Sequence, residues 1–253
     1  MEVHAHTHTA RKKWTHYFWE FLMLFLAVFC GFLAEYQLEH KIEKDREKQY
    51  IKSLLFDLQR DSLLLAANIA EGPRIFQYSD SLITELKKRP LEGREKRVYT
   101  FLSLISAGIS FKYYDRTVSQ LRNSGAFRLI QKQTVSDALL DYDVQMRDAV
   151  NYATSVESWN FVTPSITYSA SIFDIDLVFK IRKSVQRYFS HPDSVSFPYP
   201  PRLITYDDRK IMEFINLQRF AQLTDEVKYY NSVEAFEKNR KLDSLIRKEY
   251  KLK

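Results

Sequence analysis

Glycine is scarce in this sequence, and its distribution excludes the phosphate-binding loops of nucleotide-binding proteins. The chain of 253 residues contains five glycines, at positions 31, 72, 93, 108 and 125. A Gly-rich loop needs at least two glycines close together, so that the backbone can approach the phosphates. No such loop can be written here, and we expect no cofactor.

Cysteine and histidine are also too few for the common catalytic and metal sites. The only cysteine, Cys30, lies inside an apolar run, so no internal disulfide can form. Beyond that run the histidines are His40 and His191, and a Ser/His/Asp arrangement or a histidine metal site would depend on His191 alone. We therefore predict no catalytic, cofactor-binding or metal-ligating residue.

Carboxylates are plentiful, but their spacing does not indicate a catalytic pair. Asp141 and Asp143 are close in sequence, and Asp207 and Asp208 are adjacent. Helix residues at such spacings point to different faces, so we expect all four side chains to be solvated. An enzyme is the least favoured class, and its one specific form would be a hydrolase with carboxylates in a cleft.

A strong surplus of one charge is absent as well. Lys and Arg number 38 and Asp and Glu number 32, which gives a net charge of +6 spread along the chain. Nucleic-acid-binding proteins usually concentrate basic residues in a patch or along one helix face. We therefore predict no nucleic-acid partner.

What the sequence does contain is a long apolar run near its N-terminus. Residues 14–34, WTHYFWEFLMLFLAVFCGFLA, would form about 31 Å of helix, which matches a bilayer's hydrocarbon core of roughly 30 Å. Trp14, Tyr17 and Trp19 would lie at one membrane interface. Phe32 is too large for the third-last position of a signal-peptidase site. We predict a single, uncleaved transmembrane helix.

The flanking charges predict the orientation of this helix. Arg11, Lys12 and Lys13 abut its N-terminal end, whereas the first charge beyond its other end is Glu35. Because positive charge resists translocation, we expect the tail, residues 1–13, in the cytoplasm. The C-terminal domain would then lie in the periplasm, at a bacterial inner membrane.

Two features of this region leave alternatives open. His4, His6 and His8 alternate along the tail and could chelate a metal ion, although a solvated tail is the simpler interpretation. Glu20 is the one acid within the apolar run, and it either pairs with a partner helix or reaches the headgroup zone.

The remaining sequence predicts an all-α fold with a helical-bundle soluble domain. Residues 35–50 carry nearly balanced charge and little to bury, which indicates a charged helical stalk that continues the membrane helix. The soluble domain would occupy residues 51–253. Within it, Gly72-Pro73 is expected to end the first helix, and a second would begin at Arg74.

Later helices are predicted from apolar spacing and from their ends. Asp115 is expected to cap a helix that ends at Gly125. Residues 135–156 carry a heptad seam, which packs against the domain's own helices or, alternatively, against a second chain. Residues 165–185 favour a helix over a strand, and residues 206–253 are expected to be helical.

Two apolar features of the C-terminal third concern possible contacts. Residues 191–201, HPDSVSFPYPP, could stack on a sugar or a peptide, although packing across their own domain is favoured. The last helix carries an apolar stripe that is expected to contribute to the internal core. The stripe consists of Phe220, Leu223, Val227 and Tyr230.

One stretch of the soluble domain resembles a known family. The segment TVSQLRNSGAFRLIQKQTVSDALLDYD, Thr117 to Asp143, is similar to an uncharacterised family of bacterial single-span membrane proteins, a domain of unknown function. In that family a helix that ends in Ser-Gly, here Ser124-Gly125, is followed by a short apolar return and a long helix. The N-terminal block is similar too, although here it is richer in aromatic residues. The resemblance implies this architecture and no activity.

Together these observations predict a membrane-anchored helical interaction or scaffold protein. Its partners would be the lipid bilayer and either another protein or a second copy of the chain. The alternative is an extracytoplasmic sensory or ligand-binding module. Because only the short tail would face the cytoplasm, such a module would act through a membrane partner, with Glu20 as the contact.

Overall fold

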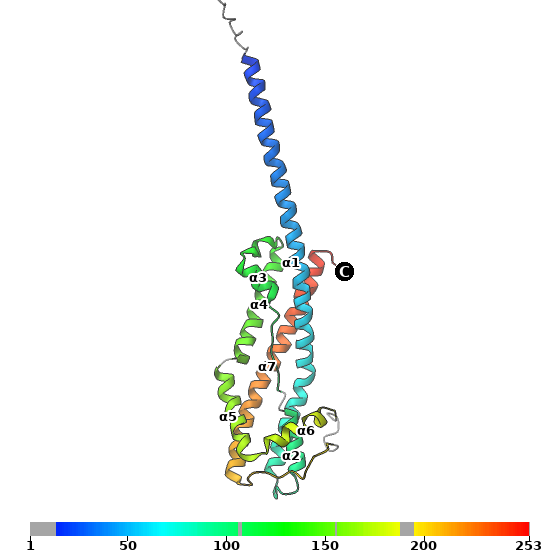
Figure 1. Ribbon diagram of the computed structural model, residues 1–253, viewed down its shortest axis with the longest axis vertical. Helices are drawn as coiled ribbons and strands as arrows, with labels where there is room; N and C mark the ends of the chain where they lie inside the picture. Colours follow the sequence, from blue (N-terminus) through cyan, green and yellow to red (C-terminus); the bar gives the residue numbers. More distant parts are fainter. Residues whose placement is uncertain (1–13, 106–107, 155, 188–194, 253) are drawn as a thin grey trace, which may run out of the picture. The chain divides into compact units, whose positions relative to one another are not determined.

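The computed structural model describes residues 14–105, 108–154, 156–187 and 195–252, and every regular element in these ranges is helical (Figure 1). The elements are α1 (Trp14–Lys87), α2 (Glu95–Ile105), α3 (Arg116–Asn123), the 3₁₀ helix η1 (Ala126–Leu129), α4 (Gln133–Thr154), α5 (Val156–Ile172), α6 (Ile175–Arg187) and α7 (Asp208–Glu249). The predicted all-α class is confirmed. The chain separates into two compact units, Met1–Ile51 and Lys52–Lys253, and α1 contributes to both.

In the first unit, α1 is long and apolar enough to cross a membrane. None of the residues in its most apolar window is buried. Phe21, Phe25 and Phe29 stack along one side of the helix, with ring centroids 6.3 and 5.8 Å apart. A helix that is apolar on all sides needs an apolar environment, so this segment is a candidate membrane span.

In the second unit, α1 runs through Gly72-Pro73 without ending, so the prediction of two separate helices was wrong. Proline removes one backbone donor and disfavours a helix interior. However, α1 buries side chains on both sides of it, such as Leu65 and Ile75, and this packing holds the helix together. Gly72 does not end the helix but allows α7 to approach α1 closely. The ring of Tyr229 on α7 lies against it, where a Cβ would overlap the ring.

The heptad seam of α4 faces the interior of its own unit, as predicted. Val135, Leu139, Tyr142, Met146 and Ala149 are each at most 2% exposed. Helix α4 packs against α7, and α5 continues along α7 towards its N-terminal end (Figure 1). The seam therefore needs no second chain to cover it.

A cluster of buried apolar residues lies where α2, α6, the end of α1 and the start of α7 meet (Figure 1). Aromatic rings occupy its centre: Phe173 lies 5.0 Å from Phe214 and 6.0 Å from Tyr99, between ring centroids. Residues 165–185 are helical, as predicted, but they divide into α5 and α6 around Phe173. The Asp174 carboxylate accepts the backbone N–H of Leu177 at 3.1 Å, which fixes the start of α6.

The described part of the aromatic loop, residues 195–201, packs across its own domain, as favoured from the sequence. Phe197 is partly buried against the apolar cluster. The Tyr199 hydroxyl donates to the Asp174 carboxylate at 2.9 Å, and the Tyr99 hydroxyl donates to the carbonyl of Arg202 at 2.8 Å. The packing of Phe197 and these two hydrogen bonds hold this segment against its own domain.

The ends of α3 agree with the prediction in one respect and differ in another. Gly125 has φ +65°, the left-handed conformation expected after a helix. Asp115 is at the N-cap position, but its side chain accepts the Ser119 hydroxyl at 2.6 Å and caps no backbone N–H. The backbone at the start of α3 is bound by carboxylates of α1 instead.

Candidate functional site

Asp141 and Asp143 on α4 differ in their surroundings, and the prediction that both are solvated was wrong for Asp143. Asp141 is exposed, but Asp143 is only 1% exposed. The Asp143 carboxylate accepts the Tyr113 hydroxyl at 3.1 Å and Nε of Arg147 at 3.0 Å, and it pairs with Arg122. Its partners come from α3, the segment before it, and the next turn of α4.

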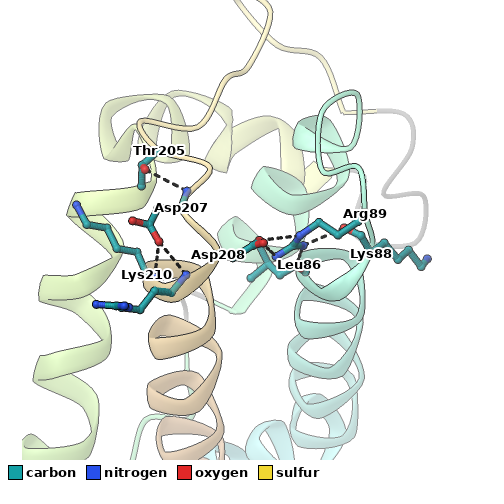
Figure 2. A network of polar contacts seen from close by, with 8 residues as sticks. Leu86, Lys88, Arg89, Thr205, Asp207, Asp208 and Lys210 are labelled. Atoms are coloured by element: carbon teal, nitrogen blue, oxygen red, sulfur yellow. Dashed lines mark hydrogen bonds and ion pairs between the residues drawn. The ribbon is translucent and has the colours of Figure 1, made fainter.

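Asp207 and Asp208 lie at the start of α7, beside the end of α1 (Figure 2). Asp207 is the N-cap residue, and its Oδ1 accepts two backbone N–H groups of the first turn, at 2.8 and 3.3 Å. Asp208 pairs with Arg89, whose Nε lies 2.8 Å from Oδ1. The Arg89 guanidinium also donates to two carbonyls at the end of α1, at 2.6 and 3.0 Å. Asp207 therefore caps the start of α7, and Asp208 links the start of α7 to the end of α1 through Arg89.

A network of polar groups is buried between α1, α3, α4 and α7. Asp57 accepts the backbone N–H of Thr117 at 3.0 Å and its hydroxyl at 2.5 Å. Asp61 accepts the backbone N–H of Tyr114 at 2.9 Å and the hydroxyl of Tyr142 at 2.9 Å. The two carboxylates are 3% and 1% exposed. They attach the start of α3 to α1.

The same network reaches α7 through an amide. The Asn239 Nδ2 group donates to the Leu58 carbonyl at 3.0 Å and to the Tyr142 hydroxyl at 3.1 Å. Burial raises the pKa of Asp61 to about 6, and it also raises the pKa of Tyr142. Asp61 is only 1% exposed and both its oxygens accept hydrogen bonds from the protein, so we assign this network to the stability of the fold and not to substrate binding.

Metal-ligating residues do not gather in the described part of the chain. No group of three or more His, Cys, Asp or Glu side chains is placed to hold a metal ion in residues 14–105, 108–154, 156–187 and 195–252. His16 and Glu20 form a local pair at 3.1 Å on α1. The tail histidines His4, His6 and His8, and His191 in the loop, lie outside the described residues.

A pocket of about 540 Å³ opens between α2, α5, α6 and α7. Its volume falls within the range of roughly 300 to 1,000 Å³ that is usual for small-molecule sites. Most of its wall is apolar. The apolar lining residues are Leu102, Ile105, Ile109, Ile166, Ala170, Ile175, Val178, Phe179 and Ala221.

The polar groups of the pocket wall fall into two sets. Ser165 Oγ donates to Gln218 Oε1 at 3.2 Å, and Ser169 Oγ donates to the Ser165 carbonyl at 2.6 Å, so these hydroxyls have internal partners. Asp225 and Lys228 pair at 3.4 Å and are mostly buried, with side chains 19% and 12% exposed. Burial raises the pKa of Asp225, although Lys228 opposes this effect.

The middle of α7 has polar residues inside and apolar residues outside. Between positions 218 and 232 the buried residues are Gln222, Thr224 and Ser232. Leu223 and Tyr230 are 55% and 67% exposed. The other members of the predicted stripe, Phe220 and Val227, are 49% and 39% exposed. The four residues share a helix face, but that face points outward, so the expectation that they contribute to the core was wrong.

The buried pair Asp57 and Asp61 carried a sequence signal, whereas the pocket did not. Asp57 and Asp61 are four residues apart in an apolar helix pattern, a spacing that places both on one face. The pocket brings together residues from segments more than 100 positions apart, such as Leu102 and Lys228, which no local pattern indicates.

The comparisons with known proteins supply no relative from which a site could be transferred. No family model, no curated protein and no solved structure matches this chain.

Proposed function

We propose that this protein is a membrane-anchored helical interaction protein that associates through the outer face of α7. The observation that supports it is the reversed pattern in the middle of α7, between positions 218 and 232, where buried polar residues oppose exposed apolar ones. An exposed apolar face of this kind marks an interaction surface in a soluble domain. The anchor would be the apolar part of α1, with the tail in the cytoplasm and the domain in the periplasm of a bacterium.

The partner that best fits this face is a second copy of the chain. Phe220, Leu223, Val227 and Tyr230 follow steps of three, four and three, which is the spacing at which two helices interlock. A stripe of this kind is self-complementary across a two-fold axis. Two copies anchored in one membrane would meet at high local concentration, so the association need not be tight in solution.

Disulfide cross-linking in membranes tests this proposal. In a Cys30→Ser background, we expect Leu223→Cys to form a covalent dimer under mild oxidation. Asp141→Cys on α4 is the matched control, since it is also exposed but lies on another helix. A dimer from the control and none from position 223 would contradict the proposal. A cross-linked product of a different mass would instead identify another protein as the partner.

A further inference from the structure

The pocket between α2, α5, α6 and α7 is separate from the outer face of α7, since none of the four stripe residues lines it. Most of its wall is apolar, and this apolar lining extends to the surface at Ile166 and Phe179, which are 62% and 65% exposed. Large apolar groups beside a concave apolar pocket favour an apolar ligand, because binding removes both surfaces from water.

The charges in the wall decide which apolar ligand fits. Lys228 and Asp225 compensate each other, and Asp225 also accepts the backbone N–H of Ile109 at 3.4 Å. Arg182 also lines the pocket, and it makes no hydrogen bond or ion pair with any residue that the structure describes. Among the residues that the structure describes, the wall therefore carries one positive charge without a carboxylate partner, that of Arg182.

An arginine at the edge of an apolar pocket selects for a carboxylate. The guanidinium group presents paired donors that match the two oxygens of a carboxylate, and such charge-assisted bonds are stronger than neutral ones. The pocket hydroxyls of Ser165 and Ser169 already donate to protein acceptors. The wall thus offers a ligand one strong polar contact and a large apolar surface.

We infer that this pocket binds a small amphipathic carboxylate, with its apolar chain against the helices and its carboxylate on Arg182. A site of this kind is what a ligand-binding or sensory module requires. It goes beyond the proposed association through α7 and does not depend on it.

Photoaffinity labelling of the full-length chain in membranes tests the inference. The probe is a diazirine derivative of dodecanoate, and the labelled peptides are mapped by mass spectrometry. We expect labels within residues 165–179 and 218–228. Labelling confined to residues 14–34 would show partitioning into the bilayer around the anchor and would overturn the inference.

Competition against the probe separates the contribution of the ligand's carboxylate from that of its apolar chain. Dodecanoate and dodecanol have the same chain length, and the ratio of their half-competing concentrations is compared between variants in identical membranes. We expect the half-competing concentration of dodecanoate, divided by that of dodecanol, to be about ten-fold higher in Arg182→Gln than in the wild type. The reason is that the variant loses a charge-assisted hydrogen bond to the carboxylate. An unchanged ratio in Arg182→Gln would refute the role of Arg182.

Two further variants provide the controls. Lys180→Gln removes a cation from the same helix, but Lys180 pairs with Asp176 at 2.5 Å and does not line the pocket. It should keep the wild-type ratio. Ala221→Phe places a ring in the pocket wall and should abolish labelling of residues 165–179 and 218–228. Retained labelling of those segments in Ala221→Phe would show that the probe binds elsewhere.

Discussion

Asp57 on α1 caps the start of α3, 60 residues further along the chain, by accepting both the backbone N–H and the hydroxyl of Thr117. Thr117 is 1% exposed, so neither donor can turn to water. The bond replaces the local cap that Asp115 does not provide. Helix α3 is thus positioned by a carboxylate of another helix.

The first prediction is that residues 52–253 fold without the anchor. This unit contains the whole apolar cluster and the buried polar network. We expect a purified fragment to show strongly helical circular dichroism and a single cooperative melt. A broad, non-cooperative melt would mean that the unit depends on the preceding helix or on a second copy.

The second prediction concerns Asp57. Asp57→Ala should destabilise the fragment by about 3 kcal/mol, because it leaves two buried donors without an acceptor. Asp115→Ala is the matched control. Its carboxylate is exposed and accepts only a hydroxyl, so we expect a loss below about 1 kcal/mol. Chemical denaturation measures both, and equal losses would show that the cap from α1 is unimportant.

The third prediction is a pH dependence that comes from Asp61. Burial raises the pKa of its carboxyl group from 3.8 to about 6 in the folded protein. The folded state therefore binds the proton more tightly than the unfolded state. Stability from this group is greatest at low pH, falls as pH rises between about 4 and 6, and is lowest above that range.

The matching experiment compares wild type with Asp61→Asn, which has nearly the same shape and cannot ionise. The wild-type free energy of unfolding should fall by about 2 kcal/mol relative to that of Asp61→Asn between pH 4 and pH 7. Asp141→Asn, at an exposed position, serves as control. A constant difference between wild type and Asp61→Asn across this range would contradict the assignment.

The fourth prediction concerns Gly125. A Cβ there would meet no atom within 4 Å, so the cost of substitution lies in the backbone, which has φ +65°. Gly125→Val should destabilise the fragment by more than about 1 kcal/mol, because β-branched residues rarely adopt this conformation. Gly125→Asn should cost less, since asparagine tolerates it better. Equal stabilities of the two variants in denaturation would refute this.

The fifth prediction concerns the close approach of α1 and α7 at Gly72. Gly72→Ala should cost about 2 kcal/mol, because the added methyl group meets the ring of Tyr229. In a Tyr229→Ala background the same change should be neutral or stabilising by up to about 1 kcal/mol, since alanine is the better helix former. A double-mutant cycle measures the coupling, and strictly additive effects would exclude the contact.

The sequence alone determined the features that depend on neighbouring residues. Apolar spacing identified the seam from Val135 to Ala149, because a helix places residues three and four apart on one face. The position of Gly125 after a polar helix end identified the left-handed residue, because only the local backbone sets that requirement. The apolar run at residues 14–34 identified the candidate membrane span, because length and apolar composition are properties of a continuous stretch of sequence.

Only the tertiary structure decided which faces are covered. Periodicity shows that Leu223 and Tyr230 share a face of α7, but it cannot show that α4 and α5 pack elsewhere on the helix. Asp143 is buried because Tyr113 and Arg122, distant in sequence, supply its hydrogen bonds. The cost of burying a polar group depends on its partners, and partners that come from other helices cannot be predicted from local spacing.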